Sequence, residues 1–452
     1  MKRADFSSPI GIVGFGAEGE ATLAYLTNQK QTALHVFDKI DVSQRVHAVN
    51  PTAVVHSGAL YLNDLSKMRT IIRSAGVPLG ELESAPSSAE ILTPTGIFFT
   101  LCPAPIIGIT GTKGKGTTAL LITHILANHF KNKQIHLLGN IGNASLWGLA
   151  HIKPNDLVVY ELSSFQLIDL KRSPHVAVVL EVSADHLDWH KDIRQYHAAK
   201  RAIVEFQTDR DYAVINADYL HSLAFALYGK GKTWWFSRRK AVEPGVFADE
   251  RQIAVLEDGV KRAIISRSEL KLLGAHNLEN VCAAAAVGTI YHVPPNEIRA
   301  ALNAFRGLEH RLEEVGNARG IRFINDSYAT TPAATIAAVQ SFAEPIVLLA
   351  GGSSKGTSYS ALAHTIVAVH NVRAVVTFGV TAPEVTRALT EAHYRGTIVA
   401  GGTTMDAICK VALREARRGD VVLLSPASAS FGLFKNATDR GRQFKQSVHA
   451  LD

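Results

Sequence analysis

A segment rich in glycine and lysine, GITGTKGKGTT at residues 108–118, has the residue types and spacing of a site for a triphosphate. Apolar residues at 105–110 predict a short buried strand before it, and leucine and isoleucine recur after it at helical spacing. A strand, a glycine-rich turn and a helix N-terminus together present backbone N–H groups and a positive dipole end to a phosphate. The segment therefore predicts a site for a nucleoside triphosphate.

Two kinds of side chain in this segment could take part in phosphate chemistry. Lys115 would supply a positive charge for the β- and γ-phosphates, and Thr117 or Thr118 a hydroxyl for a magnesium ion. The pattern runs Gly111-x-x-Gly114-Lys115-x-Thr117, so it departs from the strict G-x-x-x-x-G-K-[ST] form in its first glycine and in the glycine after the lysine. The segment is therefore a variant of the usual phosphate loop.

Three further side chains could complete such a site. Glu161 closes an apolar run and could hold magnesium, because a hard cation prefers oxygen ligands; alternatively it is a buried acid bonded by the backbone or by Ser163. His186 follows the next apolar run and could contact the metal or a phosphate. The spacing of His186 and His190 could also suggest zinc on a helix, although a third nitrogen or sulfur ligand is not evident. Lys200 would by default be a solvated surface lysine. If it were instead buried beside metals, desolvation would favour its neutral amine.

A second glycine motif lies near the N-terminus. Gly14, Gly16 and Gly19 follow a predicted strand in the pattern G-x-G-x-x-G, and Asp38 comes about twenty residues later. This pattern is a dinucleotide-binding fingerprint in which the acid holds a ribose hydroxyl. Taken alone it would support an NAD-dependent oxidoreductase. It is compatible with the triphosphate loop if the first part of the chain binds a different nucleotide.

Strand-like runs followed by helical patterns recur along the whole chain, for example DLVVYEL, IVLLAGG and DVVLLSP. This alternation predicts parallel sheets wound with helices, with ligands at the carboxyl ends of the strands. We expect three such units, at residues 1–101, 102–305 and 306–452. The segment 210–270 is less regular than the rest.

Composition narrows the class of protein. Of the 452 residues, 47% are hydrophobic and 19% charged, which describes a globular chain with a large core. The net charge of +7 fits phosphorylated small molecules as well as nucleic acid. Basic residues around Trp234 and Trp235 could stack on bases, but are more typical of the solvated rim of an edge strand. Three widely spaced cysteines argue against a disulfide framework. Without an apolar leader or an 18-residue apolar run, we expect a cytoplasmic protein that binds neither membrane nor nucleic acid.

Several motifs occur in a fixed order along the chain: GITGTKGKGTT, YELSSFQL, DHLDWH, QYHAAKRAI, GAHNLENVC, GLEHRLEEV, NDSYATTPAAT and LLSPASASFGLFKNATDRGRQF. In this order they resemble the Mur ligase family, the ATP-dependent amide-forming enzymes of peptidoglycan precursor synthesis. The resemblance covers nearly the whole chain. It implies an α/β fold of three domains: a Rossmann-like N-terminal domain for a UDP moiety, a central P-loop ATPase domain, and a Rossmann-like C-terminal domain.

The resemblance also implies roles for individual residues. Catalysis would involve Lys115, Glu161, His186 and Lys200, and magnesium would be held by Thr117, Glu161, His186 and Lys200. ATP would be held by Gly111, Thr112, Gly114, Lys115, Gly116, Thr117, Thr118, Asn140, Asn277, Arg311 and Asp326. The UDP-linked substrate would lie against Gly14, Gly16, Gly19 and Asp38, and glutamate against Thr330, Lys355 and Ser430. Lys200 aligns with the lysine that the family carbamylates, which would turn a cation into a carboxylate-like metal ligand.

The implied reaction joins glutamate to UDP-N-acetylmuramoyl-L-alanine through an acyl phosphate, in a monomeric enzyme. D-Glutamate is the expected amino acid. Tyr328 replaces a usual lysine, Ala437 a usual aromatic residue and Gly432 a usual aspartate, so an L-glutamate-adding ligase is an alternative. Folylpolyglutamate synthases share the Gly-Lys-Gly sequence and the modified lysine, and are a second alternative. A phosphate-loop switch that binds a protein partner is a third.

Overall fold

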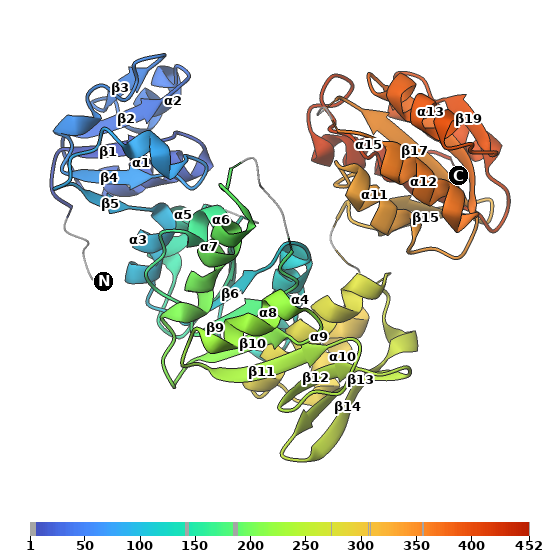
Figure 1. The fold of residues 1–452 in the computed structure, drawn as a ribbon, viewed down its shortest axis with the longest axis horizontal. Coiled ribbons are helices and arrows are strands. Elements are labelled where there is room, and N and C mark those ends of the chain that lie inside the picture. Colours follow the sequence, from blue (N-terminus) through green and yellow to red (C-terminus); the bar gives the residue numbers. More distant parts are fainter. Residues whose placement is uncertain are drawn as a thin grey trace. The chain divides into compact units, whose positions relative to one another are not determined.

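The computed structural model contains three β-sheets with helices packed against them (Figure 1). The structure describes residues 6–140, 144–183, 189–272, 274–305, 307, 309–354 and 357–451. The chain divides into two compact units: Met1–Leu270 with Leu278–Ala304, and Lys271–Asn277 with Phe305–Asp452. The first unit holds two of the sheets and the second unit holds the third. The predicted α/β class is therefore confirmed.

The first sheet is entirely parallel, with strand order β3-β2-β1-β4-β5. Its central strand is buried at every position, as expected of a parallel strand covered on both faces. The strand order changes direction between β1 and β4, and ligands of such sheets bind where this happens. Its elements are β1 (Ile10–Val13), α1 (Ala17–Asn28), β2 (Leu34–Asp38), α2 (Ser43–Val49), β3 (Val54–Ser57), β4 (Thr70–Arg73), β5 (Glu90–Leu92) and the following α3 (Pro94–Leu101).

The second sheet has nine strands in the order β14-β13-β12-β11-β10-β9-β6-β8-β7. The strands from β7 to β12 run parallel, and β13 and β14 add an antiparallel edge. Its strands are β6 (Ile106–Thr110), β7 (Ile135–Gly139), β8 (Leu157–Glu161), β9 (Val176–Val179), β10 (Tyr212–Asn216), β11 (Lys232–Ser237), β12 (Gly245–Ala248), β13 (Gln252–Glu257) and β14 (Val260–Ser266). The helices of this part are α4 (Lys115–His129), α5 (Ser145–Gly148), α6 (Ser164–Leu167), α7 (Ile193–Glu205), α8 (Leu220–Leu223), α9 (Ala275–Ile290) and α10 (Pro295–Ala304).

The third sheet has the order β15-β16-β20-β17-β18-β19, and only the β15–β16 pair is antiparallel. Alternate residues of β17 enter apolar clusters on opposite faces of the sheet, so both faces are covered. Its strands are β15 (Glu313–Ala318), β16 (Ile321–Asn325), β17 (Ile346–Gly352), β18 (Val372–Gly379), β19 (Thr397–Ala400) and β20 (Val421–Leu424). Its helices are α11 (Pro332–Val339), α12 (Ser360–Val369), α13 (Ala382–Glu391), α14 (Met405–Glu415) and α15 (Ala437–His449).

Three predictions from composition can be compared with the fold. The three cysteines are free thiols, which agrees with the absence of a disulfide framework. Among the described residues, no helix has the length and apolar character needed to cross a membrane.

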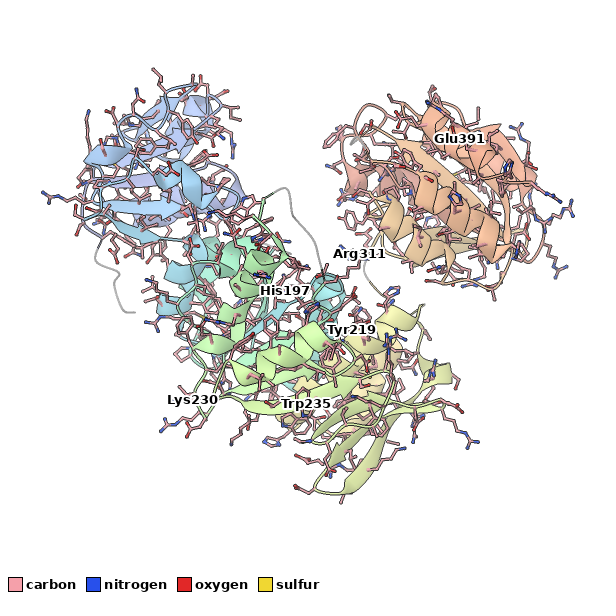
Figure 2. All side chains as sticks on the ribbon, viewed as in Figure 1. His197, Tyr219, Lys230, Trp235, Arg311 and Glu391 are labelled. Carbon is pink, nitrogen blue, oxygen red and sulfur yellow. The ribbon has the colours of Figure 1, made fainter. Side chains whose placement is uncertain are left out.

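The segment around Trp234 and Trp235 forms β11, which pairs with strands on both sides and is not an edge strand (Figure 2). The predicted edge position is therefore wrong, although the basic residues Lys230, Lys232, Arg239 and Lys240 are exposed as predicted. Trp234 is buried and Trp235 packs partly buried against the apolar core, which does not favour base stacking.

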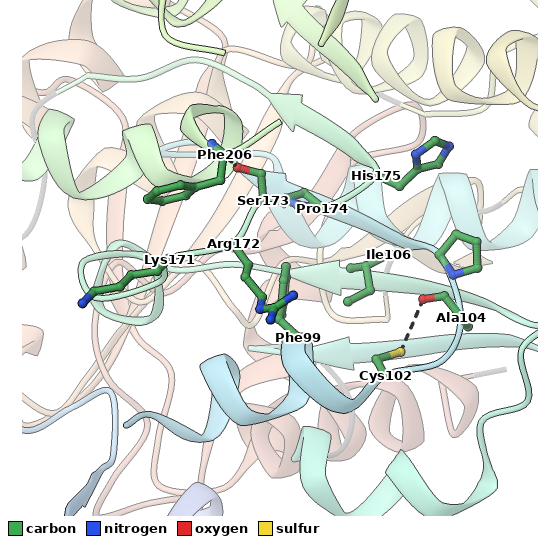
Figure 3. Close-up of a pocket in the computed structure, with 11 residues that line it drawn as sticks. Phe99, Cys102, Ala104, Ile106, Lys171, Arg172, Ser173, Pro174, His175 and Phe206 are labelled. Carbon is green, nitrogen blue, oxygen red and sulfur yellow. Dashed lines mark hydrogen bonds between the residues drawn. The ribbon is translucent and has the colours of Figure 1, made fainter. Parts of the chain in front are cut away.

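A cavity of about 490 Å³ opens at the amino-terminal ends of β6 and β9 (Figure 3). Its lining includes Cys102, Arg172, His175 and Phe206. The glycine-rich segment predicted to bind a triphosphate follows the opposite, carboxyl end of β6. The cavity is therefore separate from the predicted site.

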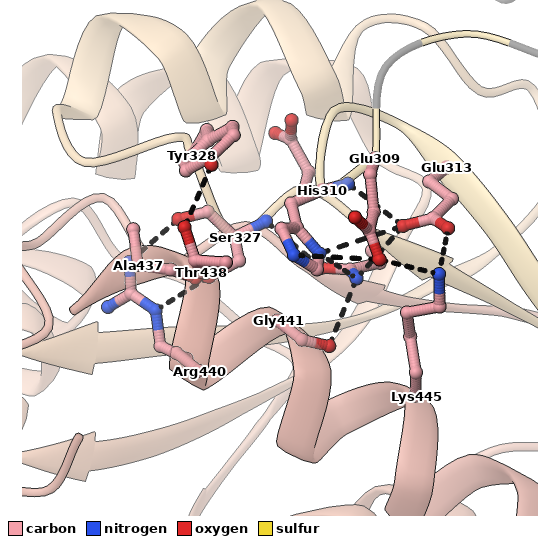
Figure 4. Close-up of polar contacts among 12 residues, drawn as sticks. Glu309, His310, Glu313, Ser327, Tyr328, Ala437, Thr438, Arg440, Gly441 and Lys445 are labelled. Carbon is pink, nitrogen blue, oxygen red and sulfur yellow. Dashed lines mark hydrogen bonds and ion pairs between the residues drawn. The ribbon is translucent and has the colours of Figure 1, made fainter. Parts of the chain in front are cut away.

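A buried polar network organises the carboxyl edge of the third sheet (Figure 4). Arg440 is fully buried and donates hydrogen bonds to the backbone oxygens of Ser327, Ser428 and Ala429. Asp326 is also buried and accepts from Ser425 Oγ at 2.8 Å. Burial raises the pKa of Asp326 to about 7, although hydrogen bonds from Ser425 and Leu312 and the charges of Arg311 and Arg440 oppose the shift. Burial lowers the pKa of Arg440 to about 10.

We expect Asp326→Asn to change how the stability of the third-sheet unit depends on pH. A carboxyl whose pKa is about 7 when folded and near 3.9 when unfolded stabilises the fold below pH 4 and loses that contribution as pH rises to 7. The asparagine variant should therefore gain up to ~4 kcal/mol relative to the wild type at pH 8.5, and little at pH 4. Urea unfolding of both proteins at the two pH values measures this difference. An equal difference at both pH values would contradict the raised pKa.

Candidate functional site

The glycine-rich segment joins β6 to α4, as predicted from the strand and helix patterns around it. Gly114 is the residue before the first turn of α4 and has a φ of +83°, which other residues rarely adopt. A Cβ on Gly114 would collide with Asn280, and one on Gly111 would lie 2.7 Å from Leu180 Cβ. Both glycines are therefore required by close packing of the loop against β9 and α9.

Hydrogen bonds anchor the loop on both sides. The backbone N–H of Thr112 donates to Glu181 O at 2.6 Å, and Ser183 N donates to Thr112 Oγ1 at 2.9 Å. The hydroxyl of Thr118 donates to Asn280 Oδ1 at 3.2 Å. The first intrahelical bond of α4 runs from Thr118 N to Gly114 O, so the N–H groups of residues 115–117 have no acceptor within the helix. Donors at this position of a helix are the ones that bind a phosphate.

Two lysine side chains meet at one backbone oxygen of this loop. Lys115 Nζ donates to Gly111 O at 3.0 Å and to Thr112 O at 3.1 Å. Lys200 Nζ donates to the same Gly111 O at 3.1 Å and to Thr110 Oγ1 at 3.3 Å. Two ammonium groups at one oxygen repel each other, and the repulsion is stronger away from water. A bound polyanion, or the loss of one positive charge, would relieve it.

Lys200 is only 1% exposed, so its default interpretation as a solvated lysine is wrong. It projects from the apolar face of α7, and its Nζ lies 4.7 Å from the centre of the Tyr196 ring. The Tyr196 hydroxyl is 3.1 Å from Thr112 Oγ1. One helix thus places a buried amine and an aromatic hydroxyl against the loop.

Oxygen ligands for a hard cation lie beside the loop. Glu161 ends β8, is 6% exposed, and its Oε1 accepts from Asn140 Nδ2 at 3.3 Å. In the sheet register it pairs with Ile109 of β6, next to the loop. The alternative partner Ser163 donates to Gln166 instead. A carboxylate from Glu161 and a hydroxyl from Thr117 in the first turn of α4 are a donor set that fits magnesium.

The predicted histidine ligand lies outside the described residues. This residue is His186, which was also one of the two histidines, with His190, in the alternative zinc site. His190 is buried, with its Nε2 2.9 Å from Ser164 Oγ. Within the described ranges, no three His, Cys, Asp or Glu side chains cluster in a way that could hold a metal. The described structure thus offers no support for zinc.

The N-terminal glycine motif lies where the strand order of the first sheet reverses. Gly14 has a φ of +86°, and a Cβ on Gly19 would collide with Gly14 O, so these two glycines shape the turn and let α1 approach it. A Cβ on Gly16 would meet no described atom within 4 Å, so its backbone faces open space. Asp38 Oδ2 accepts from Phe15 N at 2.6 Å. Asp38, predicted to hold a ribose hydroxyl, thus holds the backbone of the glycine loop in this structure.

The remaining predicted residues belong to the second unit. Asp326, Thr330 and Ser430 follow the carboxyl ends of β16 and β20, and the guanidinium of Arg311 lies 5.9 Å from the Tyr328 ring (Figure 2). Asn277 lies in the first turn of α9. Lys355 is outside the described residues. The first unit therefore brings together the loop, Asn140, Glu161 and Lys200, while the second unit holds the other predicted contacts for ATP and glutamate.

Two of the three departures from the family pattern meet in one cluster. The Tyr328 hydroxyl is 2.9 Å from Thr438 Oγ1, and the neighbouring Ser327 Oγ donates to Ala437 O at 2.7 Å (Figure 4). The ring of Tyr328 also packs edge-on against the buried His310. An aromatic side chain is therefore present beside the start of α15, although residue 437 is alanine.

Sequence analysis missed several residues that hold the site in place. Asn280 contacts the loop from α9, and Tyr196 contacts it from α7. Glu279 accepts from Asn216 Nδ2 and from the Tyr219 hydroxyl, which fixes the start of α9. Asn277 and Asn280, three residues apart just before the alanine run at 283–286, were a usable signal, because residues at this spacing share one face of a helix. The other partners depend on contacts between distant segments.

Comparisons with known proteins give the family. Residues 109–288 match the Mur ligase middle domain, and residues 310–428 match the Mur ligase glutamate ligase domain. The chain is 35% identical to the UDP-N-acetylmuramoylalanine--D-glutamate ligase of Acetivibrio thermocellus, over 100% of this chain and 98% of that one. It is 36% identical to the ligase of the same name from Symbiobacterium thermophilum, over 97% of each chain.

Solved structures show the same fold at low sequence identity. UDP-N-acetylmuramate-alanine ligase from Thermotoga maritima is 16% identical with a TM-score of 0.60, over 98% of this chain and 99% of that one. A pseudomurein peptide ligase from Methanothermus fervidus is 17% identical with a TM-score of 0.57, over 98% and 100%. With full-length relatives above 30% identity and both domain matches in order, this chain is a member of the Mur ligase family.

Proposed function

We propose that this protein joins D-glutamate to UDP-N-acetylmuramoyl-L-alanine at the expense of ATP, in the cytoplasmic synthesis of peptidoglycan precursors. The relatives that match it over nearly its whole length are named as ligases for this reaction. The observation that carries the proposal is the meeting of Lys115 and Lys200 at Gly111 O, inside an anchored loop at the N-terminus of α4. This arrangement is suited to a polyanion such as the triphosphate of ATP.

The proposed reaction has two steps. A carboxylate oxygen of the muramoyl-alanine attacks the γ-phosphorus of ATP, the bond to the bridging oxygen breaks, and ADP leaves. Lys115 and the N–H groups of residues 115–117 stabilise the charge that develops on the transferred group. The amine of glutamate then attacks the acyl carbon, phosphate departs, and the amine loses a proton. Magnesium held by Glu161 and Thr117 would neutralise charge on the phosphates.

Each part of the chain has a proposed share in this reaction. Residues 1–101 hold the UDP moiety at Gly14, Gly16 and Gly19, residues 102–305 hold the triphosphate, and residues 306–452 hold glutamate at Thr330, Lys355 and Ser430. Adenine and ribose contacts fall to Asn277, Arg311 and Asp326. We propose that the enzyme acts as a monomer.

We propose that Lys200 is carbamylated in the active enzyme. Burial disfavours its ammonium charge, and Lys115 shares its acceptor Gly111 O. Attack of the neutral amine on the carbon of CO₂, with loss of a proton, gives a carbamate of charge −1. The modification removes the repulsion with Lys115. Together with Glu161 and Thr117, its oxygen atoms would suit a magnesium ion.

An L-glutamate-adding enzyme is the second candidate, and one observation favours it. Tyr328 reaches Thr438 and lies beneath Arg311, so an aromatic ring occupies the carboxyl edge of the third sheet where the family usually has a lysine. A lysine would contribute a cation to a carboxylate, whereas tyrosine contributes a hydroxyl. The two candidates differ only in the isomer accepted.

Phosphate release from ATP should distinguish these candidates. With UDP-N-acetylmuramoyl-L-alanine and magnesium present, we expect D-glutamate to stimulate release at least ~10-fold over the reaction without amino acid, and L-glutamate to have little effect. The Lys115→Ala variant is the negative control, and we expect it to lose at least ~100-fold of the stimulated rate. Stimulation by L-glutamate alone would favour the second candidate. Stimulation by neither isomer would contradict the proposed function.

Replacing Lys200 tests the carbamate. We expect Lys200→Ala to lower the stimulated rate ~100-fold or more, because the cavity left by the side chain lacks the oxygen ligand. A short-chain carboxylate such as acetate or propionate should restore part of the rate by occupying that cavity. Phosphate release over a range of carboxylate concentrations gives the measurement, with chloride at equal ionic strength as the control. Equal rates with carboxylate and chloride, or full activity of the unrescued variant, would exclude the carbamate role.

A further inference from the structure

An acidic side chain lies within the N-terminal glycine motif. Glu18 is in the first turn of α1, between Gly16 and Gly19. A carboxylate there would repel a phosphate bound at the start of the helix, unless it is held away from the loop. In the structure, Glu18 Oε2 accepts from Ala75 N at 3.1 Å, and Oε1 accepts from Gln166 Nε2 at 2.8 Å. The second bond joins the glycine motif to the part of the chain that carries the second sheet.

The amide of Gln166 is fixed in one orientation at both ends. Its Oε1 accepts from Ser163 N at 3.0 Å, and a backbone N–H can only donate. Its Nε2 must then face Glu18, and an ionised carboxylate can only accept. Gln166 is buried, and its own N–H donates to Ser163 Oγ, which completes a capping box at α6. The position of Glu18 is therefore coupled to the local structure at the start of α6.

The residues just before this cap are hydrogen-bonded to the phosphate-loop site. Leu162 N donates to Ile109 O at 2.8 Å, and Thr110 Oγ1 donates to Leu162 O at 3.0 Å. Thr110 Oγ1 in turn accepts from Lys200 Nζ. Glu161, the proposed magnesium ligand, directly precedes Leu162. A continuous set of hydrogen bonds and short chain segments thus leads from Glu18 to the phosphate loop.

A second contact joins the same two parts without involving the side chains of Glu18 or Gln166. Arg73, fully buried at the end of β4, donates to Asp169 Oδ2 at 2.6 Å. Asp169 follows α6. Arg73 also donates to Phe165 O at 3.5 Å and to Ala75 O at 3.3 Å, so its own replacement would disturb both the α6 cap and the Glu18 contact. Asp169 bonds to neither Glu18 nor Gln166, so replacing Asp169 weakens the attachment of α6 to the first sheet while leaving the Glu18–Gln166 bond in place.

We propose that the Glu18–Gln166 hydrogen bond is a positioning contact that couples diphosphate binding at residues 14–19 to nucleotide binding at residues 111–118. A diphosphate on the glycine motif binds best when the Glu18 carboxylate is held by Gln166 and Ala75 N, away from the ligand. That arrangement also holds the α6 cap, and with it the segment that carries Glu161. Two ligands that favour one arrangement favour each other. The inference rests on the proposed UDP site.

A set of four proteins tests the coupling by binding alone: the wild type, Gln166→Glu, Glu18→Gln and the double variant. The dissociation constant of ADP with magnesium is measured by calorimetry, with and without saturating UDP. In the wild type we expect UDP to tighten ADP binding ~5-fold or more. Gln166→Glu keeps an acceptor for Ser163 but places two carboxylates together, so the effect should fall below ~2-fold.

The other two proteins change the acceptor residue, Glu18, alone or together with Gln166. Glu18→Gln leaves one donor unsatisfied and should also reduce the effect of UDP. In the double variant, the amide introduced at position 18 can donate to the carboxylate introduced at position 166 and accept from Ala75 N. Exchanging the two side chains therefore reverses the direction of the bond without removing it, and part of the coupling should return.

Asp169→Asn is the matched control. It weakens the ion pair with Arg73 and should lower the melting temperature, but the ~5-fold effect of UDP should remain. Equal coupling in the wild type and Gln166→Glu, a wild type that shows no coupling, or a double variant no better than Gln166→Glu would each overturn the proposal. Glutamate-dependent phosphate release by the wild type is measured separately. Its absence would count against the proposed reaction, whereas the ADP binding curves alone decide the coupling.

Discussion

The meeting of two lysines at Gly111 O is the constraint on which the rest of the site depends. Two helices of the second-sheet part carry these lysines: Lys115 lies in the first turn of α4, and Lys200 on the apolar face of α7. Packing of both helices in the core fixes the backbone positions from which the two lysines reach Gly111 O. The fold therefore brings two basic side chains to one backbone oxygen of the loop.

The topology explains why this charge lies where it does. In both the first and second sheets, a central strand lies between two strands that come later in the chain, and a glycine-rich turn follows its carboxyl end. Helix N-termini converge at such points, so backbone donors are available without further side chains. Glycines at 14 and 114 accept the positive φ that each turn needs, and those at 19 and 111 allow the close approach of neighbouring backbone or side chains. The two turns thus share the same local structure.

Local patterns were enough to predict strands such as β8, β17 and β20 and the turn between β6 and α4, because apolar runs and glycine spacing report on short stretches of chain. The end of β8 at Glu161 was predictable for the same reason. The burial of Lys200 was not, since its helix is amphipathic and only packing against β6 and Tyr196 shows which face the lysine occupies. The central position of β11 was also missed, because pairing on both sides is a property of the sheet.

The two glycine loops differ in how they handle charge. In the second, lysines add to the positive field of the helix N-terminus, so the loop alone attracts an anion. In the first, Glu18 opposes that field, and the loop can accept an anion only while Ala75 N and Gln166 hold the carboxylate away. Its affinity must then depend on the α6 cap, which lies beside the second loop. Because Glu18 weakens the first loop's affinity whenever Gln166 does not hold it, the proposed coupling links the two loops through this one carboxylate.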